Sequence, residues 1–473
     1  MPPSSDVGWA DWRCGCEATR CPSWRHAIGD RSGSMTPERA VGRLADLGLD
    51  PPDIDSRRLL FELVLSRFRA LGVGAPEHVL WVPGRLEVFG KHTDYAGGRT
   101  LVSTVPRGFA MAIGRRFDTR TNVVDAGRLE SASFETNPAI AGDAAMRGRT
   151  SKGWRHYVQT VLGRLGRNFP SAALASDIVL ASDLPRASGM SSSSALMVGV
   201  AAALGRLAGL EDRPEWSDNI KSPLDAASYY ACVENGLSFG GLTGDSGVGT
   251  HGGSEDHAAI VTGEAGRLSA FSFVPMRRIT DVELPEDWRF VLTPSGVAAD
   301  KTGGAKGPYN RLAHGAAVLL GLWNAGEPRC TSLAAALGSS KRAAARLREL
   351  VNQSHDDDWP APSLLKRLDH FIREDARIPV ALDAVASVDG KTLGQLSAES
   401  QSDAETLLEN QVPETVALAA SARQLGAFAS SSFGAGFGGS VWALVVRDEA
   451  PEFARRWHPG AFVARPAPPL TVL

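Results

Sequence analysis

The segment from Asp177 to about Leu207 constrains the fold more than any other part of this sequence. A strand-like run, Asp177 to Ala181, leads into a loop of small residues, and an apolar helix-like run follows. Unpaired backbone N–H groups and the dipole at the start of such a helix favour a bound anion. Serine runs also occur in linkers, but linkers are not normally placed between an apolar strand and an apolar helix. The segment therefore predicts a phosphate cradle.

Residues 83–98 form a second segment that is rich in both glycine and ionisable side chains. Arg85, Lys91, His92 and Asp94 fall within ten residues, between a strand-like run and a Gly-Gly turn. Such crowding offers convergent donors and acceptors to a polyhydroxylated ligand or a phosphate. A polar hairpin turn is the alternative that the residues leave open.

Residues 433–440 form a third segment and contain a formal GxGxxG pattern. A dinucleotide site requires a helix after these glycines. Here Ser440 to Val446 continues as a strand, so we expect a tight loop in which backbone approaches another loop or a ligand. The Gly390-Lys391-Thr392 triplet does not complete a Walker A loop, because Val385 stands where its first glycine should be.

Composition excludes several classes of protein. Lys and Arg total 50 against 53 Asp and Glu, a net charge of −3, so we expect no nucleic-acid and no membrane partner. The best apolar run, Ala195 to Leu210, is interrupted by Arg206 and is shorter than the roughly 18 apolar residues of a membrane span. Five cysteines in 473 residues are too few for a disulfide framework, which favours a cytoplasmic location. Glycine is in excess, at 50 of 473 residues.

Helical and strand-like patterns alternate in mixed order, which predicts an α+β fold. We expect residues 35–280 and 281–473 to form two domains, with helical spacing from Met35 to Leu71. Strands are expected at His78 to Val82 and Arg85 to Phe89, separated by a turn at Pro83-Gly84. Residues 324–361 are expected to be a solvated insertion, in which Asp356 to Asp358 offer an alternative divalent-ion site.

Residues 1–34 differ in character from the rest of the chain. They show no periodicity, and we expect either a disordered extension or a true start at Met35, where Thr36 caps a helix. Cys14, Cys16 and Cys21, with His26 nearby, form an incomplete set for a zinc knuckle.

The three glycine-rich segments together resemble the galactokinase branch of the GHMP small-molecule kinases. They occur in the family order, and the resemblance covers roughly residues 60 to 450. It implies a two-domain GHMP kinase fold with the active site between the domains. It also implies transfer of the γ-phosphoryl group of Mg-ATP to the anomeric hydroxyl of galactose or a related sugar, by a monomer or weak homo-oligomer.

The resemblance also implies roles for particular residues. Asp256, in Gly253-Ser-Glu-Asp-His257, corresponds to the catalytic base, and Arg85 to the residue that faces it and offsets phosphoryl charge. Positions that match sugar contacts are Lys91, His92, Asp94, Gly253 and Tyr309. Positions that match the ATP loop are Pro185, Gly189, Ser191, Ser192, Ser193, Ser194 and Ala195. Ser193 and Glu234 match the Mg²⁺ site, although Glu234 precedes Asp256 by more residues than is usual in the family.

Four departures from the family pattern bear on specificity and loop geometry. Lys91 replaces a glutamate that contacts the C6 hydroxyl, Glu87 replaces Asn, and His257 replaces Gln. Ala187 replaces a glycine, which is tolerable if its φ is negative. A cation at position 91 favours a C6-modified or acidic sugar such as galacturonate. Alternatively, Lys91 pairs with Glu87 and leaves the C6 position to water.

The sequence leaves three alternatives to a kinase site open. A non-catalytic sugar-binding regulator shares the resemblance and is separated from an enzyme only by turnover. A serine hydrolase is suggested by Gly244-Asp245-Ser246-Gly247 with His251 nearby, although its barrel and an upstream His are not apparent. A metal site could combine His251, Glu255 and His257, but a glycine-rich loop spaces them poorly. The glycine-rich stretch 239–253 is not explained by any of these readings.

Overall fold

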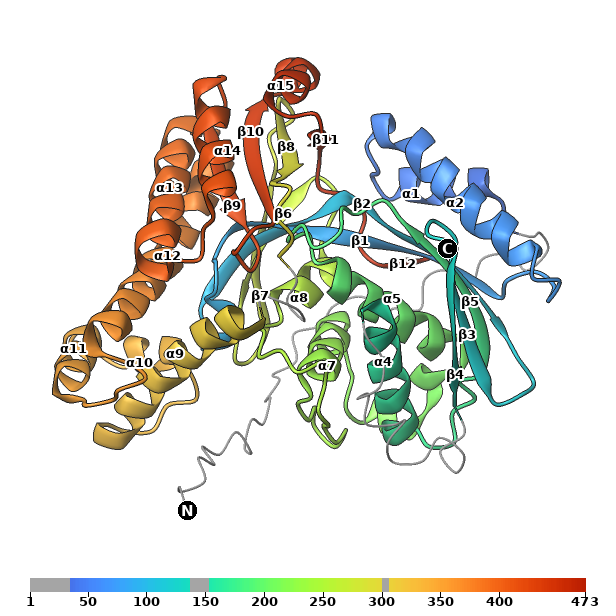
Figure 1. Ribbon diagram of the computed structural model, residues 1–473, viewed down its shortest axis with the longest axis horizontal. Coiled ribbons are helices and arrows are strands. Elements are labelled where there is room, and N and C mark those ends of the chain that lie inside the picture. Colours follow the sequence, from blue (N-terminus) through green and yellow to red (C-terminus); the bar gives the residue numbers. More distant parts are fainter. Residues whose placement is uncertain (1–34, 137–152, 300–305) are drawn as a thin grey trace.

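The computed structural model describes residues 35–136, 153–299 and 306–473. The possible zinc ligands Cys14, Cys16 and Cys21 lie outside the described residues. Figure 1 shows two sheets that meet near the middle of the molecule, with helices on their outer faces. Among the residues described, no helix combines the length and the apolar composition that a bilayer span needs.

The first sheet is mainly antiparallel, as the α+β prediction requires. Its main path runs β12-β1-β2-β5-β3-β4, and β6 and β7 extend it from β2. The strands are β1 (His78–Phe89), β2 (Arg99–Arg115), β3 (Arg120–Asp125), β4 (Glu130–Glu135), β5 (Ser176–Ser182), β6 (Arg267–Ser272), β7 (Arg277–Glu283) and β12 (Thr471–Val472). The pairing of β3 with β5 is parallel. Strand β12 comes from the far end of the sequence and pairs with Leu80 and Trp81 of β1.

Strand β1 corrects one sequence prediction, because the expected turn at Pro83-Gly84 is absent and the chain stays extended through it. A register shift between Pro83 and Arg85 absorbs the irregularity. A Cβ at Gly84 would lie 2.6 Å from Leu184 Cδ2 and 2.8 Å from the Met190 carbonyl oxygen. Gly84 therefore allows the predicted phosphate loop to pass close to the backbone of β1.

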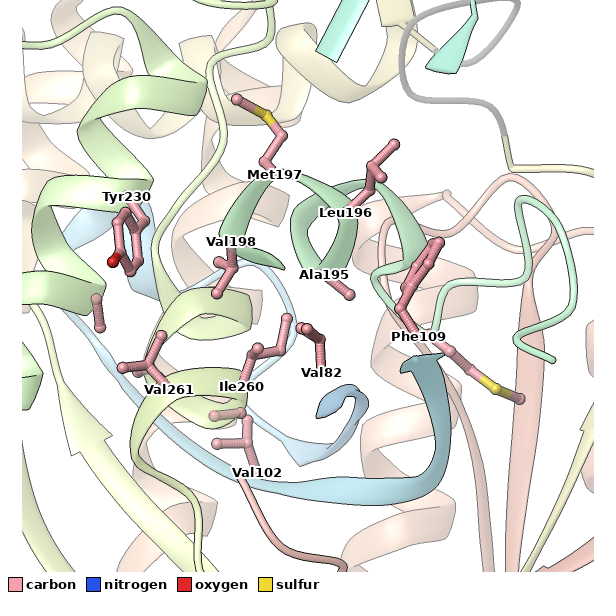
Figure 2. Close-up of a cluster of buried hydrophobic side chains, with 14 of the residues drawn as sticks. Val82, Val102, Phe109, Ala195, Leu196, Met197, Val198, Tyr230, Ile260 and Val261 are labelled. Carbon is pink, nitrogen blue, oxygen red and sulfur yellow. The ribbon is translucent and has the colours of Figure 1, made fainter. Parts of the chain in front are cut away.

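Two helical layers cover the first sheet on opposite faces. Helices α1 (Pro37–Asp46) and α2 (Ile54–Arg69) cover one face, with a break at Pro51-Pro52 where one helical region was expected. Helices α4 (Trp154–Asn168), α5 (Ser192–Leu207), α7 (Pro223–Asn235) and α8 (Glu255–Thr262) cover the other face. Figure 2 shows Ala195 to Val198 of α5 and Ile260 of α8 packed over Val82 of β1. This apolar layer fixes the starts of α5 and α8 relative to β1.

The second sheet has the antiparallel order β11-β8-β10-β9. Its strands are β8 (Trp288–Pro294), β9 (Ala429–Phe433), β10 (Ser440–Val446) and β11 (Phe462–Ala464). Helices α12 (Ala361–Ala386), α13 (Gly390–Asp403), α14 (Pro413–Gln424) and α15 (Ala450–Trp457) surround it (Figure 1). Asp389 caps α13 by accepting from Thr392 N, so the Gly390-Lys391-Thr392 triplet begins a helix.

The segment expected to be a solvated insertion has a core of its own. Helices α9 (Lys306–Gly326), α10 (Leu333–Gly338) and α11 (Ala343–Gln353) pack with the first part of α12. Leu333, Leu347 and Val351 are fully buried in this cluster. The expectation was wrong because short apolar stripes at helical spacing were hidden among the charges of this region.

The glycine-rich stretch 239–253 is largely explained by backbone packing. Arg167 and Asn168 of α4 donate to the carbonyl oxygens of Gly244 and Thr243 at 3.0 and 3.1 Å. Added Cβ atoms at Gly244 and Gly247 would overlap the backbone at the end of α7. These two glycines allow a loop to lie directly on that backbone.

Candidate active site

A cleft lies where the two sheets meet, and both halves of the sequence line it. Of the residues predicted for the site, Arg85, His92, Asp94, Gly253, Tyr309, Ser194, Glu234 and Asp256 line the cleft. The structure therefore brings both predicted catalytic residues and four of the five predicted sugar contacts to one cavity. Gly434 and Ala435 of the third glycine-rich segment also line it.

An ion pair between Arg85 and Asp256 lies in this cleft. Arg85 Nε is 2.7 Å from Asp256 Oδ1, and the two residues are 2% and 7% exposed. Ser194 Oγ donates to the second carboxylate oxygen at 3.3 Å, and Arg85 Nη1 donates to the Gly189 carbonyl at 2.8 Å. Burial lowers the pKa of Arg85, but the neighbouring carboxylates, Asp256 first, outweigh burial and raise it. The guanidinium is therefore a fixed positive charge that orients Asp256.

Two further carboxyl groups contact the same guanidinium. Arg85 Nη2 lies 2.5 Å from Glu255 Oε1 and 3.4 Å from Glu87 Oε2. Glu87 also accepts from Gly434 N at 3.1 Å, which ties β1 to the loop before β10. Burial is the largest cause that raises the pKa of Glu87 and of Glu255. Glu87 is one of the four departures from the family pattern, and the sequence indicates Glu255 only as a possible metal ligand.

The loop after β1 holds its polar side chains in defined orientations. Asp94 accepts from Glu255 N at 3.1 Å and from Tyr95 N at 2.8 Å. His92 Nε2 lies 3.1 Å from the Ala435 carbonyl oxygen, so this nitrogen must carry the proton. His92 Nδ1, 2.9 Å from the Tyr95 hydroxyl, is then free to accept in the neutral ring. Gly253 faces Asp94 so closely that an added Cβ would overlap its carboxylate.

Lys91 is not brought to the cleft, and this corrects the expectation that its ammonium contacts the acceptor. The side chain is 1% exposed and donates to the hydroxyls of Ser400 and Ser431 at 2.7 and 2.9 Å. Burial lowers the pKa of Lys91, while the charges of Glu374 and then Glu87 oppose that shift. The alternative, in which Lys91 pairs with Glu87, holds only as an interaction between charges, because the hydrogen bonds of the Lys91 ammonium go to two serines. The basis for a C6 carboxylate at Lys91 is therefore lost.

The strand, loop and helix expected around the phosphate-loop segment are present as β5, an irregular loop, and α5 beginning at Ser192. Ser191 has φ 59°, and its buried hydroxyl has no hydrogen-bond partner. Ala187 has φ 46°, so the condition of a negative φ is not met, and this alanine adopts the backbone conformation that favours glycine. Pro185, Gly189, Ser192, Ser193 and Ala195 belong to the loop or the first turn of α5 and do not line the cleft.

The third segment forms the tight loop that its sequence predicts. Gly434, Gly436, Gly438 and Gly439 all have positive φ, and β10 follows as a strand. A Cβ at Gly434 would lie 2.9 Å from the Gly189 carbonyl oxygen. The glycines therefore let this loop lie against the phosphate loop.

The predicted metal residue Glu234 is buried at the cleft, and one of its carboxylate oxygens has no hydrogen-bond partner. His257 Nε2 lies 3.1 Å from that oxygen, but outside hydrogen-bond geometry. An unsatisfied carboxylate oxygen is the kind of ligand that Mg²⁺ prefers, so Glu234 fits the ion. Among residues 35–136, 153–299 and 306–473, no group of three or more His, Cys, Asp or Glu is arranged to hold a metal. The alternative sets around His251 and Asp356 are therefore not supported.

Sequence reasoning missed two residues of helix α12 that hold the loop after β1, and a histidine beside one of them. Glu374 accepts from Gly90 N and Lys91 N at 3.0 and 3.3 Å. Arg367 donates to the His92 carbonyl oxygen at 2.6 Å, and His370 Nδ1 lies 3.3 Å from Arg367. The available signal was a row of ionisable residues at helical spacing (Arg367, His370, Glu374, Arg377) inside an otherwise apolar stripe.

The serine-hydrolase alternative fails at Asp245. This residue accepts from Gly247 N at 2.9 Å and lies 3.6 Å from the fully buried Arg164. Ser246 is exposed in the same turn. The motif is thus a turn that anchors the glycine-rich loop to α4.

Comparisons with known proteins agree with this geometry. The galactokinase galactose-binding signature matches residues 66–115, the GHMP kinase N-terminal domain residues 156–227, and the GHMP kinase C-terminal region residues 381–463. A galactokinase of Haemophilus influenzae is 24% identical over 376 residues, 79% of this chain and 86% of the relative. A galactokinase of Streptomyces coelicolor is 27% identical over 385 residues, 80% of this chain and 87% of the relative.

Solved structures share the fold. The galactokinase of Lactococcus lactis complexed with galactose matches with a TM-score of 0.70 and 21% identity, covering 87% of this chain and 99% of that one. The mevalonate kinase of Methanococcus jannaschii matches with a TM-score of 0.52 and 14% identity, covering 83% and 99%. The galactokinase signature and the two GHMP kinase regions match in order along the sequence, so the chain is similar to the galactokinase branch of the GHMP kinases and is a phosphotransferase of the sugar-kinase type.

Proposed function

We propose that this protein is an ATP-dependent sugar 1-kinase that transfers a phosphoryl group to the anomeric hydroxyl of galactose or a close relative. The observation that carries the proposal is the buried Arg85–Asp256 pair, 2.7 Å apart, in a cleft between the phosphate loop and the loop after β1. Both loops belong to the segments that match the family.

In this proposal Asp256 accepts the proton of the sugar hydroxyl. Arg85 holds one carboxylate oxygen and Ser194 donates to the other, so the carboxylate is oriented before the acceptor binds. A base must lie within hydrogen-bond reach of the proton it takes, and the guanidinium adds positive charge where phosphoryl charge develops. Positioning and charge stabilisation carry most of the rate enhancement in phosphoryl transfer.

Asp94 and Tyr309 are proposed to contact the sugar hydroxyls, and the His92 ring, whose nitrogens pair with Tyr95 and Ala435, is proposed to lie against the sugar. Asp94 already accepts from two backbone N–H groups, which hold its carboxylate toward the cleft. The Gly253 backbone is proposed to approach the sugar beside it. Ser193 and Glu234 would hold Mg²⁺, and that ion would supply positive charge against the phosphates of ATP. The unpartnered hydroxyl of Ser191 and the start of α5 support the ATP loop as the cradle for those phosphates.

Release of ADP from Mg-ATP and galactose by the purified protein tests this proposal. We expect Asp256→Asn to lower kcat by about 10² to 10⁴, the usual contribution of a positioned base. Asp357→Asn, an exposed carboxylate remote in sequence from the site, is the matched control and should retain wild-type activity. Galactose and ATP binding without ADP release would instead support the sugar-binding regulator.

A further inference from the structure

The cleft has an excess of acidic groups over basic ones. Among the described residues that line it, the single guanidinium of Arg85 faces five carboxyl groups, and Lys91 is absent from the lining. The carboxyl groups belong to Glu87, Asp94, Glu234, Glu255 and Asp256. The proposed kinase reaction uses Asp256 as base, Asp94 as a sugar contact and Glu234 as a metal ligand. Glu87 and Glu255 have no part in it.

Glu87 and Glu255 each keep an unsatisfied oxygen in this cleft. They are 2% and 7% exposed, their two carboxyl groups lie close enough to share a hydrogen bond, and no other group donates to Glu87 Oε1 or Glu255 Oε2. Their other oxygens already share Arg85 Nη2, the nitrogen next to the Nε that holds Asp256. One guanidinium cannot neutralise three buried carboxylates, and a buried charge without a partner is costly. The carboxyl groups of Glu87 and Glu255, called the pair below, therefore require a proton or a cation.

We propose that Glu87 and Glu255 select an acceptor that carries a positive charge, namely an amino sugar whose ammonium group lies beside the reacting hydroxyl. This inference rests on the proposed function, because it assigns the acceptor of the same site. Both carboxyl groups share a guanidinium with Asp256, so the cation they bind lies close to the hydroxyl that Asp256 deprotonates. In a sugar phosphorylated at C1, the nearest such position is C2.

A metal ion explains the two oxygens less well than an ammonium does. Among the residues that the structure describes, no three acidic, histidine or cysteine side chains converge with metal-binding geometry. An ammonium needs only acceptors for its three N–H bonds, and two carboxylates together with a sugar hydroxyl or water supply them. Such charge-assisted hydrogen bonds are about twice as strong as neutral ones.

The charges around the pair determine its state when no acceptor is bound. Arg85 and Lys91 favour its ionised form, and Asp94, Asp256 and Glu374 oppose it. Burial raises the pKa of both carboxyl groups above their ordinary value. An ammonium bound beside the two carboxyl groups would add positive charge there and oppose that rise.

Parallel assays with three sugars test the inference. Galactosamine, galactose and N-acetylgalactosamine are compared as acceptors by ADP release at pH 7. We expect kcat/KM for galactosamine to exceed that for galactose by about tenfold or more, the effect of one charge-assisted hydrogen bond. N-acetylgalactosamine carries a larger, uncharged group at the same carbon and should fall below galactosamine.

The isosteric variants Glu87→Gln and Glu255→Gln separate charge from shape. Each should reduce the preference for galactosamine over galactose by about tenfold, and thermal melting checks that each is folded. Galactose turned over as well as or better than galactosamine would overturn the inference and leave the proposed function standing. No ADP release from any sugar would overturn both. If neither variant folds, the three-sugar comparison on the wild-type protein decides the question.

Discussion

Gly253→Ala should strongly reduce activity while the protein remains folded. The alanine Cβ would overlap the Asp94 carboxylate, so that side chain must move. In its present position Asp94 accepts from Glu255 N at 3.1 Å and from Tyr95 N at 2.8 Å. A sugar hydroxyl that donates to the Asp94 carboxylate makes a hydrogen bond to a charged group, which contributes about 1.5–3 kcal/mol. The loss of that bond lowers kcat/KM by a factor of about 10 to 150. We therefore expect kcat/KM for the preferred sugar to fall by at least tenfold.

The assay is steady-state ADP release across sugar concentrations, with thermal melting beside it. Gly321→Ala is the control, because nothing lies within 4 Å of its added Cβ in helix α9. An alanine there should keep full activity and raise stability by about 0.5–1 kcal/mol. A folded Gly253→Ala protein with kcat/KM within twofold of the wild type would refute the assignment of Asp94 to the sugar.

Three further perturbations follow from the structure. Ala187→Gly should raise stability by about 1 kcal/mol in thermal melts, because φ 46° is strained for alanine; an unchanged or lower midpoint would contradict this. Lys91→Met should lower the free energy of unfolding by about 1–3 kcal/mol, because two hydrogen bonds to serines are lost. The ratio of galactose to galacturonate turnover should stay unchanged, and a change in that ratio would show that Lys91 contacts the acceptor. Asp53 has its pKa raised to about 6, chiefly by burial, with Arg57 opposing. The folded state thus binds the Asp53 proton more tightly than the unfolded state, so stability falls as pH rises from about 4 to about 6. Asp53→Asn should make the free energy of unfolding, measured by urea denaturation, less dependent on pH over that range. A variant whose pH profile is the same as that of the wild type would contradict the raised pKa of Asp53.

The local parts of the site could be predicted because their sequence signals are local. A strand, a small-residue loop and an apolar helix from Asp177 to Leu207 fold where the pattern places them. The loop at Gly434 and the strand at Ser440 are likewise recognisable from their glycines and β-branched residues. The choice of an α+β fold followed from the mixed order of such elements.

What could not be predicted depends on partners remote in sequence. Pro83-Gly84 has the composition of a turn, yet it stays extended because Leu184 and Met190 cross it. Lys91 adjoins His92 in sequence, but its ammonium turns toward serines more than 300 residues away. A one-dimensional pattern gives the neighbours of a side chain along the chain and not the direction in which it points.

Strand β12 has a consequence for the order of folding during synthesis. Strand β1 carries Arg85, and its outer edge is covered at Leu80 and Trp81 by residues 471 and 472. Until those residues leave the ribosome, the backbone N–H and C=O groups of this edge are open to pairing with another chain. A ribosome-bound intermediate that stops short of residue 471 should therefore be more prone to aggregation than the full-length protein, even with every residue of the cleft already translated.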